Sequence, residues 1–190
     1  MMNNKYSIII CDPPWDYGGQ TQHSGKNSSD TGGALRHYPT MTVDQMIEEI
    51  DPAAWAEDDC LLFMWSSWPH LDQAIRLGTE WGFRYVHTPF IWHKQRTNPG
   101  FYTLTQTEPV LCFKRGKIPQ PRGTRNERQV VEWLRGRHSE KPREVQDRIT
   151  RMFPTQRKLE MFARESYPGW DAWGNEVTNT VDTTLSWMTQ

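Results

Sequence analysis

Asp12, Pro13, Pro14 and Trp15 stand together directly after the apolar run Ile8–Ile10. This combination suits the alkylation of an exocyclic amine on an aromatic base. Such an amine is a poor nucleophile because its lone pair is delocalised into the ring, so a site needs acceptors for both amine hydrogens. The Asp12 carboxylate and the Pro13 carbonyl could be these acceptors, since proline fixes φ and brings no competing N–H. The Trp15 ring offers a face for a flat base. The four residues fit a site that orients an amine for an in-line displacement.

A structural role for the same residues stays open. Asp12 could cap a helix, and the two prolines could simply turn the chain. The polar stretch 16–37 that follows favours a site, because loops of roughly 20 residues in compact domains are usually functional or disordered.

Apolar periodicity predicts the elements that would position these residues. The predicted strands are Lys5–Cys11, Cys60–Trp65, Arg84–Trp92, Pro109–Phe113, a short one near Gln129–Trp133, and Lys158–Phe162. The predicted helices are Thr42–Ile50, 70–81 and Pro142–Met152, with a capping box at Thr42 and Gln45 and a stop at Gly82. A second polar loop is predicted over 93–107.

The alternation of strands and helices predicts an α/β fold with a mostly parallel, doubly wound sheet in a single domain. Ligands of such sheets bind beyond the carboxyl ends of strands. Asp12 and Arg164 both follow predicted strands directly, so the sequence predicts a site at that edge.

Charge is distributed unevenly along the chain. Residues 114–164 hold 15 Lys and Arg against 6 Asp and Glu, whereas the remainder holds 7 against 17. A basic segment in a nearly neutral protein suggests one face for a polyanion. The alternative is a solvated surface whose charge is balanced by acidic neighbours in space.

Cys11, Cys60 and Cys112 are far apart and lie inside or beside apolar runs, which is typical of buried, reduced thiols. The histidines show no metal-binding spacing. No signal peptide and no apolar run of about 18 residues is present, so we expect a soluble, cytoplasmic protein.

Three further motifs accompany residues 12–15: HYPTM at 37–41, HSEKP at 138–142 and KLEMFARESYPGWDAWGNE at 158–176. In this order and spacing they resemble the messenger-RNA N6-adenosine methyltransferase family. The resemblance is closer to its bacterial and phage DNA adenine methyltransferase members, and it covers about residues 5–176.

The resemblance implies a Rossmann-like methyltransferase fold, S-adenosylmethionine as methyl donor, and a catalytic motif that precedes the main cofactor-binding strand. It implies one methyltransferase domain over 1–176, with 177–190 as a tail. The implied catalytic residues are Asp12, Pro13, Pro14 and Trp15. The implied cofactor-binding residues are Cys11, Asp12, Lys141, Phe162, Arg164, Asn175 and Glu176. The implied substrate-binding residues are Trp15, Tyr17, His37 and Tyr38, and no metal site is implied. Basic side chains add candidate phosphate contacts to the substrate-binding set: Arg96, Arg122 and Arg125.

Other roles stay open for some of these residues. Lys141 could sit in solvent at a helix start, Arg164 could pair with Glu160 four residues earlier, and Tyr38 could be ordinary core. Trp170 and Trp173 are expected to be core residues.

The expected partner is duplex DNA with the target adenine flipped out. Phosphate contacts from the basic segment would give affinity without sequence choice. A homodimer would widen the basic surface. Two alternatives remain: the same chemistry on RNA adenosine or cytosine N4, and a catalytically inactive nucleic-acid-binding subunit. A degenerate subunit would be expected to lose the acid or the aromatic, and Asp12 and Trp15 are both present.

Overall fold

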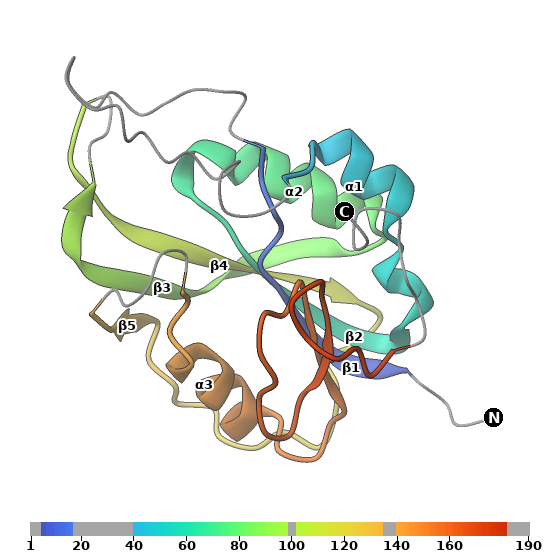
Figure 1. Cartoon of the computed structure of the whole chain (residues 1–190). Coiled ribbons are helices and arrows are strands. Elements are labelled where there is room, and N and C mark those ends of the chain that lie inside the picture. Colours follow the sequence, from blue (N-terminus) through green and yellow to red (C-terminus); the bar gives the residue numbers. More distant parts are fainter. Residues whose placement is uncertain (1–4, 17–39, 99–101, 135–139, 182–190) are drawn as a thin grey trace.

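The computed structural model describes residues 5–16, 40–98, 102–134 and 140–181. Within these ranges a seven-stranded sheet forms the centre, with strand order β5-β3-β4-β2-β1-β6-β7 (Figure 1). The strands are β1 (Tyr6–Cys11), β2 (Ala56–Trp65), β3 (Arg84–Asn98), β4 (Thr105–Arg115), β5 (Val130–Glu132), β6 (Lys158–Met161) and β7 (Asp171–Trp173).

The sheet is mixed but mostly parallel. β1 pairs in parallel with β2 and with β6, β6 pairs in parallel with β7, and β3 pairs in parallel with β5. β4 is antiparallel to both of its neighbours, β2 and β3. Among the described strands, β4 is therefore the one that runs against the others. The predicted α/β class with a mostly parallel sheet is confirmed.

Helices cover both faces of the sheet, as the doubly wound prediction requires. α1 (Val43–Glu49) and α2 (Leu71–Glu80) lie on one side and α3 (Glu144–Met152) on the other (Figure 1). Two short 3₁₀ turns, η2 (Pro52–Ala54) and η3 (Trp68–His70), precede β2 and α2.

The β1 isoleucines divide between the two layers, because successive side chains of a strand point to opposite faces. Ile9 packs in one core cluster with Met46 of α1. Ile8 and Ile10 pack in the second cluster with Ile149 of α3. A strand that is apolar on both faces is thus explained by a helix layer on each side.

Local signals set the helix ends. Thr42 and Gln45 form the predicted capping box, with each side chain accepting from the other's backbone N–H at 3.2 and 2.8 Å. Gly82 has φ +82 just after α2, where a side chain would be strained. Both predicted signals are confirmed.

The predicted polar loop over 93–107 was wrong for most of its length. β3 continues to Asn98 and β4 begins at Thr105, and the two strands pair as a hairpin beyond the rest of the sheet. The polar sequence predicted a loop because many side chains of this hairpin face solvent, whereas the hairpin is stabilised by pairing of its backbone.

The C-terminal part of the described chain packs on the sheet edge. Trp170 and Trp173 are buried, as expected of core residues. β7 was not predicted. Thr180 bonds to the backbone of Ala172, and Val181 is buried. The division into a domain and a tail at 176/177 stays a prediction.

The three cysteines are buried and unpaired, as predicted. None of the helices among the described residues has the length and apolar character that a membrane span requires.

Candidate active site

Asp12 lies at the edge where most strands end. It follows Cys11, the last residue of β1, which pairs with Met64 on β2 and Met161 on β6. The start of β4 reaches the same edge, since β4 runs in the opposite direction. Ligand sites of open α/β sheets lie at such edges. The predicted placement of Asp12 at a strand end is confirmed.

The two prolines turn the chain and leave their carbonyls as acceptors. The Trp15 backbone N–H donates to the Pro13 carbonyl at 2.9 Å, and the Met41 N–H donates to the Pro14 carbonyl at 2.8 Å. A carbonyl oxygen accepts two hydrogen bonds, and among the described residues the Pro13 carbonyl has a second position left for a ligand. Met41 ends the HYPTM motif, so this turn joins two of the sequence motifs.

Four charged side chains alternate in sign beside this turn, and we call them the Asp12 charge line: Asp12, Lys141, Glu108 and Lys94. Lys141 Nζ lies 3.0 Å from Asp12 Oδ2 and 3.5 Å from Glu108 Oε2. Lys94 Nζ lies 3.1 Å from Glu108 Oε1, and its side chain is only 4% exposed. The interpretation of Lys141 as a solvent-exposed residue was wrong, because it bridges two carboxylates.

Burial and these charges act against each other on the carboxyl groups. Burial raises the pKa of Asp12 above its ordinary value, with Lys141 opposing the rise and Glu108 adding to it. Burial also acts to raise the pKa of Glu108, but Lys141 and Lys94 outweigh it and the pKa is lowered. Asp12 is therefore the carboxylate whose burial is incompletely compensated.

Trp15 is almost fully buried, at 5% exposure. Its ring stacks on His70 with centroids 5.7 Å apart, and His70 Nδ1 lies 2.8 Å from the Ser67 hydroxyl. The indole N–H of Trp15 is buried and meets no acceptor in the described part of the chain. One ring face is thus occupied by His70, and the stacking of a base on Trp15 stays a prediction.

The predicted cofactor residues gather at the ends of β6 and β7. Arg164 Nε lies 3.6 Å from Glu176 Oε1, and both side chains are exposed. Phe162, with φ +59, packs edge-on against Trp173. The alternative pairing of Arg164 with Glu160 was wrong, because Glu160 is bonded to Arg143 and Gln146.

Gly174 brings the two strand ends together. A Cβ at this position would lie 2.1 Å from the Ala163 carbonyl oxygen, which no side chain tolerates. Asn175 and Glu176 follow directly and are exposed beside Arg164. Cys11 is 1% exposed, so only its backbone can take part in binding.

The predicted phosphate contacts do not all reach this edge. Arg96 is exposed near the end of β3. Arg122 stacks on Phe153, just after the C-terminal end of α3, whereas Lys141 precedes its start. Arg122 therefore lies at the other end of α3 from Lys141, and within the described residues neither Arg122 nor Arg125 contacts Asp12. Tyr17, His37 and Tyr38 lie outside the described residues.

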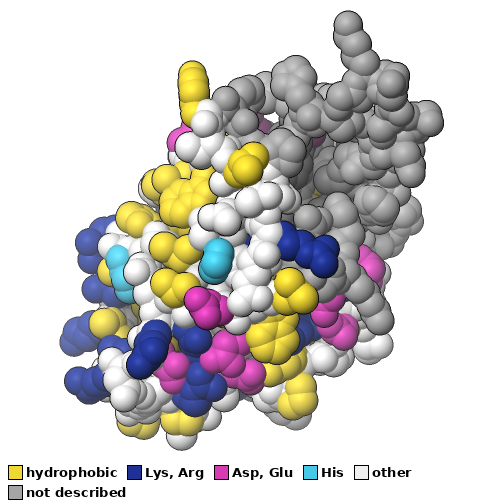
Figure 2. Space-filling model, turned by 90° about the vertical axis from the view of Figure 1, so that its left-hand side faces the viewer, with side chains coloured by type: hydrophobic (Ala, Val, Ile, Leu, Met, Phe, Trp, Pro, Cys, Tyr) yellow, Lys and Arg dark blue, Asp and Glu magenta, His cyan; other side chains and the backbone are white. Residues whose placement is uncertain are grey.

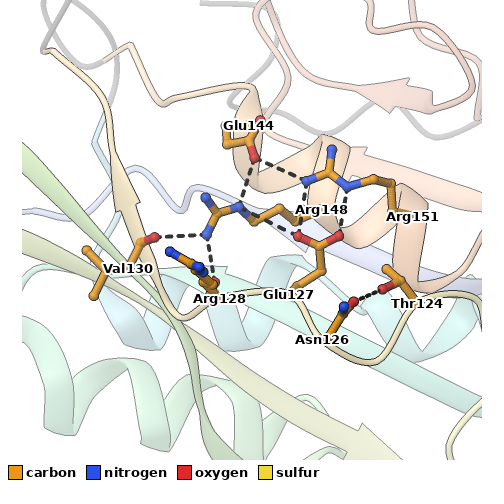
Figure 3. A network of polar contacts seen from close by, with 8 residues as sticks. All are labelled: Thr124, Asn126, Glu127, Arg128, Val130, Glu144, Arg148 and Arg151. Atoms are coloured by element: carbon orange, nitrogen blue, oxygen red, sulfur yellow. Dashed lines mark hydrogen bonds and ion pairs between the residues drawn. The ribbon is translucent and has the colours of Figure 1, made fainter.

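Much of the basic segment is engaged in internal contacts. Figure 3 shows the α3 network, which we define as Glu127, Glu144, Arg148 and Arg151. Arg148 also donates to the carbonyls of Arg128 and Val130, at 2.6 and 2.9 Å. The alternative that acidic neighbours balance this charge therefore holds for the α3 network.

The edge near β5 carries exposed apolar side chains. Val130, Trp133 and Leu134 are each about half exposed, and Trp92 Nε1 donates to the Trp133 carbonyl at 2.8 Å. Figure 2 looks onto this side of the molecule, where apolar patches alternate with Lys, Arg, Asp and Glu. Exposed aromatics among charges are typical of surfaces on which bases stack.

Sequence reasoning missed Glu108 and Lys94. A signal for Lys94 was present: Phe90, Trp92 and Lys94 share one face if the strand continues past Trp92, and all three are buried. Glu108 directly precedes the predicted strand at Pro109. His70 gave no signal beyond its aromatic neighbours.

No group of three or more His, Cys, Asp or Glu side chains in the described residues is arranged to hold a metal ion. The donor set instead pairs Lys141 and Arg164 with Asp12 and Glu176. Two cations and two carboxylates at one edge suit a zwitterionic ligand.

Comparison with known proteins identifies the family of the chain. The MT-A70 family model matches residues 6–176. The chain is 47% identical over 183 residues to the type II methyltransferase M.MunI of Mycoplasma sp, covering 91% of this chain and 78% of that protein. It is 28% identical over 187 residues to the human N(6)-adenosine-methyltransferase catalytic subunit METTL3, covering 91% of this chain and 28% of that one. A probable N(6)-adenosine-methyltransferase MT-A70-like protein of Oryza sativa subsp. japonica is 29% identical over 188 residues, with 23% of its length covered.

The fold, the acidic strand end and these relatives define a methyltransferase of the Rossmann-like α/β class. The chain belongs to the MT-A70 family, as its motifs predicted.

Proposed function

We propose that this chain transfers a methyl group from S-adenosylmethionine to the exocyclic N6 of adenine in DNA. The observation that carries the proposal is the ion pair of Asp12 with Lys141 at the carboxyl end of β1. Lys141 opposes the effect of burial on a carboxylate at the position where the fold binds ligands.

Asp12 and the Pro13 carbonyl would hold the adenine amine. Asp12 Oδ1 and the free acceptor position of Pro13 would each take one amine hydrogen, which turns the nitrogen lone pair toward the methyl group. An acceptor on the base would satisfy the buried Trp15 N–H. The amine nitrogen would form a bond to the methyl carbon as the carbon–sulfur bond breaks, and the methylated amine would then give up a proton. The raised pKa of Asp12 makes its carboxylate a better acceptor for that proton than an exposed one.

S-adenosylmethionine would supply a methyl group activated by a positively charged sulfur. Lys141 and Arg164 would hold its carboxylate, and Glu176 with Asn175 would bind its ribose hydroxyls, as acidic residues do in other nucleotide folds. Phe162 would pack beside the bound molecule.

The choice of DNA rests on the bacterial type II methyltransferase at 47% identity. Duplex DNA would present its adenine flipped out. Arg96 and the exposed Trp133 would contact the strand near the site. A homodimer stays a prediction.

Mass spectrometry of nucleosides tests the proposal. The protein is incubated with S-adenosylmethionine and unmethylated duplex DNA, with matched RNA in parallel. Asp12→Ala serves as the inactive variant and Asp44→Asn, an exposed aspartate, as the matched control. We expect N6-methyladenine in DNA only, absent with Asp12→Ala and unchanged with Asp44→Asn. Methylation of RNA alone, or of cytosine, would replace the proposed substrate, and no product in either polymer would favour an inactive subunit.

A further inference from the structure

Lys141 is shared between two carboxylates, and this sharing has a consequence for Asp12. Its ammonium lies 3.0 Å from Asp12 and 3.5 Å from Glu108. The two oxygens of Glu108 are divided in turn, one facing Lys141 and the other facing Lys94. The strength of each ion pair in the Asp12 charge line therefore depends on the ion pair next to it.

We propose that Glu108 and Lys94 are positioning residues, which set how strongly Lys141 holds the acceptor carboxylate of Asp12. The proposal deepens the proposed function and rests on Asp12 as the group that accepts the amine hydrogens. Neither Glu108 nor Lys94 needs to touch the substrate for this role.

Lys94 anchors the far end of the line. It projects from β3 toward Glu108 on the adjacent β4, and with 4% exposure its charge has little contact with water. A buried ammonium without a partner is strongly disfavoured. Lys94 and Glu108 therefore stabilise each other, and the pairing with Lys94 weakens the attraction of Glu108 for Lys141.

Removal of the Glu108 charge and removal of the Lys94 charge should shift the pKa of Asp12 in opposite directions. Without the Glu108 charge, Lys141 keeps Asp12 but loses the other carboxylate that attracts it, and a like charge near Asp12 disappears as well. Without the Lys94 charge, Glu108 attracts Lys141 more strongly, and Asp12 loses part of its counter-charge. A balance of this kind suits a carboxylate that must accept hydrogen bonds from the amine. If Lys141 held Asp12 too strongly, it would compete with the amine, and if it held Asp12 too weakly, Asp12 would become protonated.

Other ionisable groups near Asp12 stay the same in these variants. They are Cys11 on β1, Glu160 on β6 and Arg164 beyond β6, each of which interacts electrostatically with Asp12. Differences among the variants therefore report on the charge line itself.

The test compares Glu108→Gln, Lys94→Met and the double variant with the wild-type protein. The pKa of Asp12 is measured from its carboxyl carbon by NMR titration of ¹³C-labelled protein, without cofactor or DNA. We expect the pKa to fall in Glu108→Gln, to rise in Lys94→Met, and to lie between these in the double variant. The acid limb of kcat/KM should move the same way, with a change of roughly threefold or more at its acidic end.

Shifts in the same direction in both single variants, or no shift, would overturn the proposal and leave the pair a purely structural one. The double variant removes two opposite charges together, so it leaves no unpaired buried ion. If Lys94→Met does not fold, Glu108→Gln against the double variant still decides the sign. The titration needs no substrate, so opposite shifts without any methylated base would support the charge line while rejecting the proposed function.

Discussion

Two networks of alternating charge adjoin helix α3, and the pKa values of their carboxylates differ. The Asp12 charge line lies before the start of α3, at the edge where the strands end. The α3 network lies along the helix and ties it to the backbone of residues 128 and 130 (Figure 3). Both contain two cations and two carboxylates.

The pKa of Asp12 is shifted in the opposite direction to those of the glutamates in the α3 network, whereas the pKa of Glu108 is lowered as theirs are. Hydrogen bonds from Arg151 lower the pKa of Glu127 despite its burial. Burial acts to raise the pKa of Glu144, but Arg148 and Arg151 outweigh it and the pKa is lowered. Burial raises the pKa of Asp12, and Lys141 does not fully offset it. Ion pairing alone therefore does not identify a site. A carboxylate whose burial is incompletely compensated at a ligand-binding edge is a candidate functional group.

The largest effect is expected from Asp12→Asn. Methyl transfer should fall by about 10³-fold or more, because the amide no longer accepts an amine hydrogen as an anion does. The pKa of Asp12 is raised on folding, so its contribution to stability is greatest at low pH and is lost as the pH rises through that raised value. At neutral pH the variant should therefore unfold at the same or a higher temperature than the wild type. Turnover assays and thermal unfolding measure the two effects, and near-normal turnover would reject the mechanism.

Lys141→Met should have the next largest effect. It removes the counter-charge of Asp12 and one proposed contact to the cofactor carboxylate, and we expect kcat/KM to fall roughly 10- to 100-fold. Lys117→Met is the matched control, since Lys117 is exposed and lies outside the charge line. Equal activity in the two variants would mean that the contact at 3.0 Å has no role in catalysis.

Arg148→Met should affect stability and leave the chemistry unchanged. Arg148 is only 14% exposed, and it satisfies two backbone carbonyls besides Glu144. Its loss leaves those acceptors without their donor, which costs about 2 kcal/mol in the free energy of unfolding. Arg76→Met, which breaks an exposed pair with Asp44, should cost less than about 0.5 kcal/mol. Denaturant titration gives both values. A large loss of kcat in Arg148→Met would contradict the prediction, because it would mean that the α3 network also affects catalysis.

The two networks also differ in what the sequence could reveal. Asp12 and Lys141 each stand in a motif, so both residues could be predicted from the sequence, although their contact could not. Lys94 lies in the stretch 93–107, for which the sequence predicts a loop, and Glu108 stands between that stretch and the predicted strand at Pro109. Their burial depends on the pairing of β3 with β4, which is a long-range contact that local periodicity does not contain.

The basic segment shows the same limit. Composition showed an excess of Lys and Arg over 114–164 but could not show which of them meet carboxylates. Arg148 and Arg151 face Glu127 only because α3 folds back along residues 124–130. The helices and most strands, in contrast, followed from apolar spacing, because each buries one or two complete faces against a neighbour.

Acid titration of stability offers the smallest and most specific test of the contrast. The pKa values of Glu127 and Glu144 are lowered on folding, so their stabilisation is present above the ordinary pKa of a glutamate and is lost as the pH falls through the lowered values. The double variant Glu127→Gln/Glu144→Gln should therefore be less stable than the wild type by about 1 kcal/mol at pH 7, with the difference shrinking below about pH 4. Asp12→Asn should show a difference of the opposite sign at pH 7, which also shrinks in acid. If both variants were less stable than the wild type at pH 7, Asp12 would be a stabilising ion-pair partner like the glutamates of the α3 network. Its burial at the strand ends would then not reduce the stability of the fold.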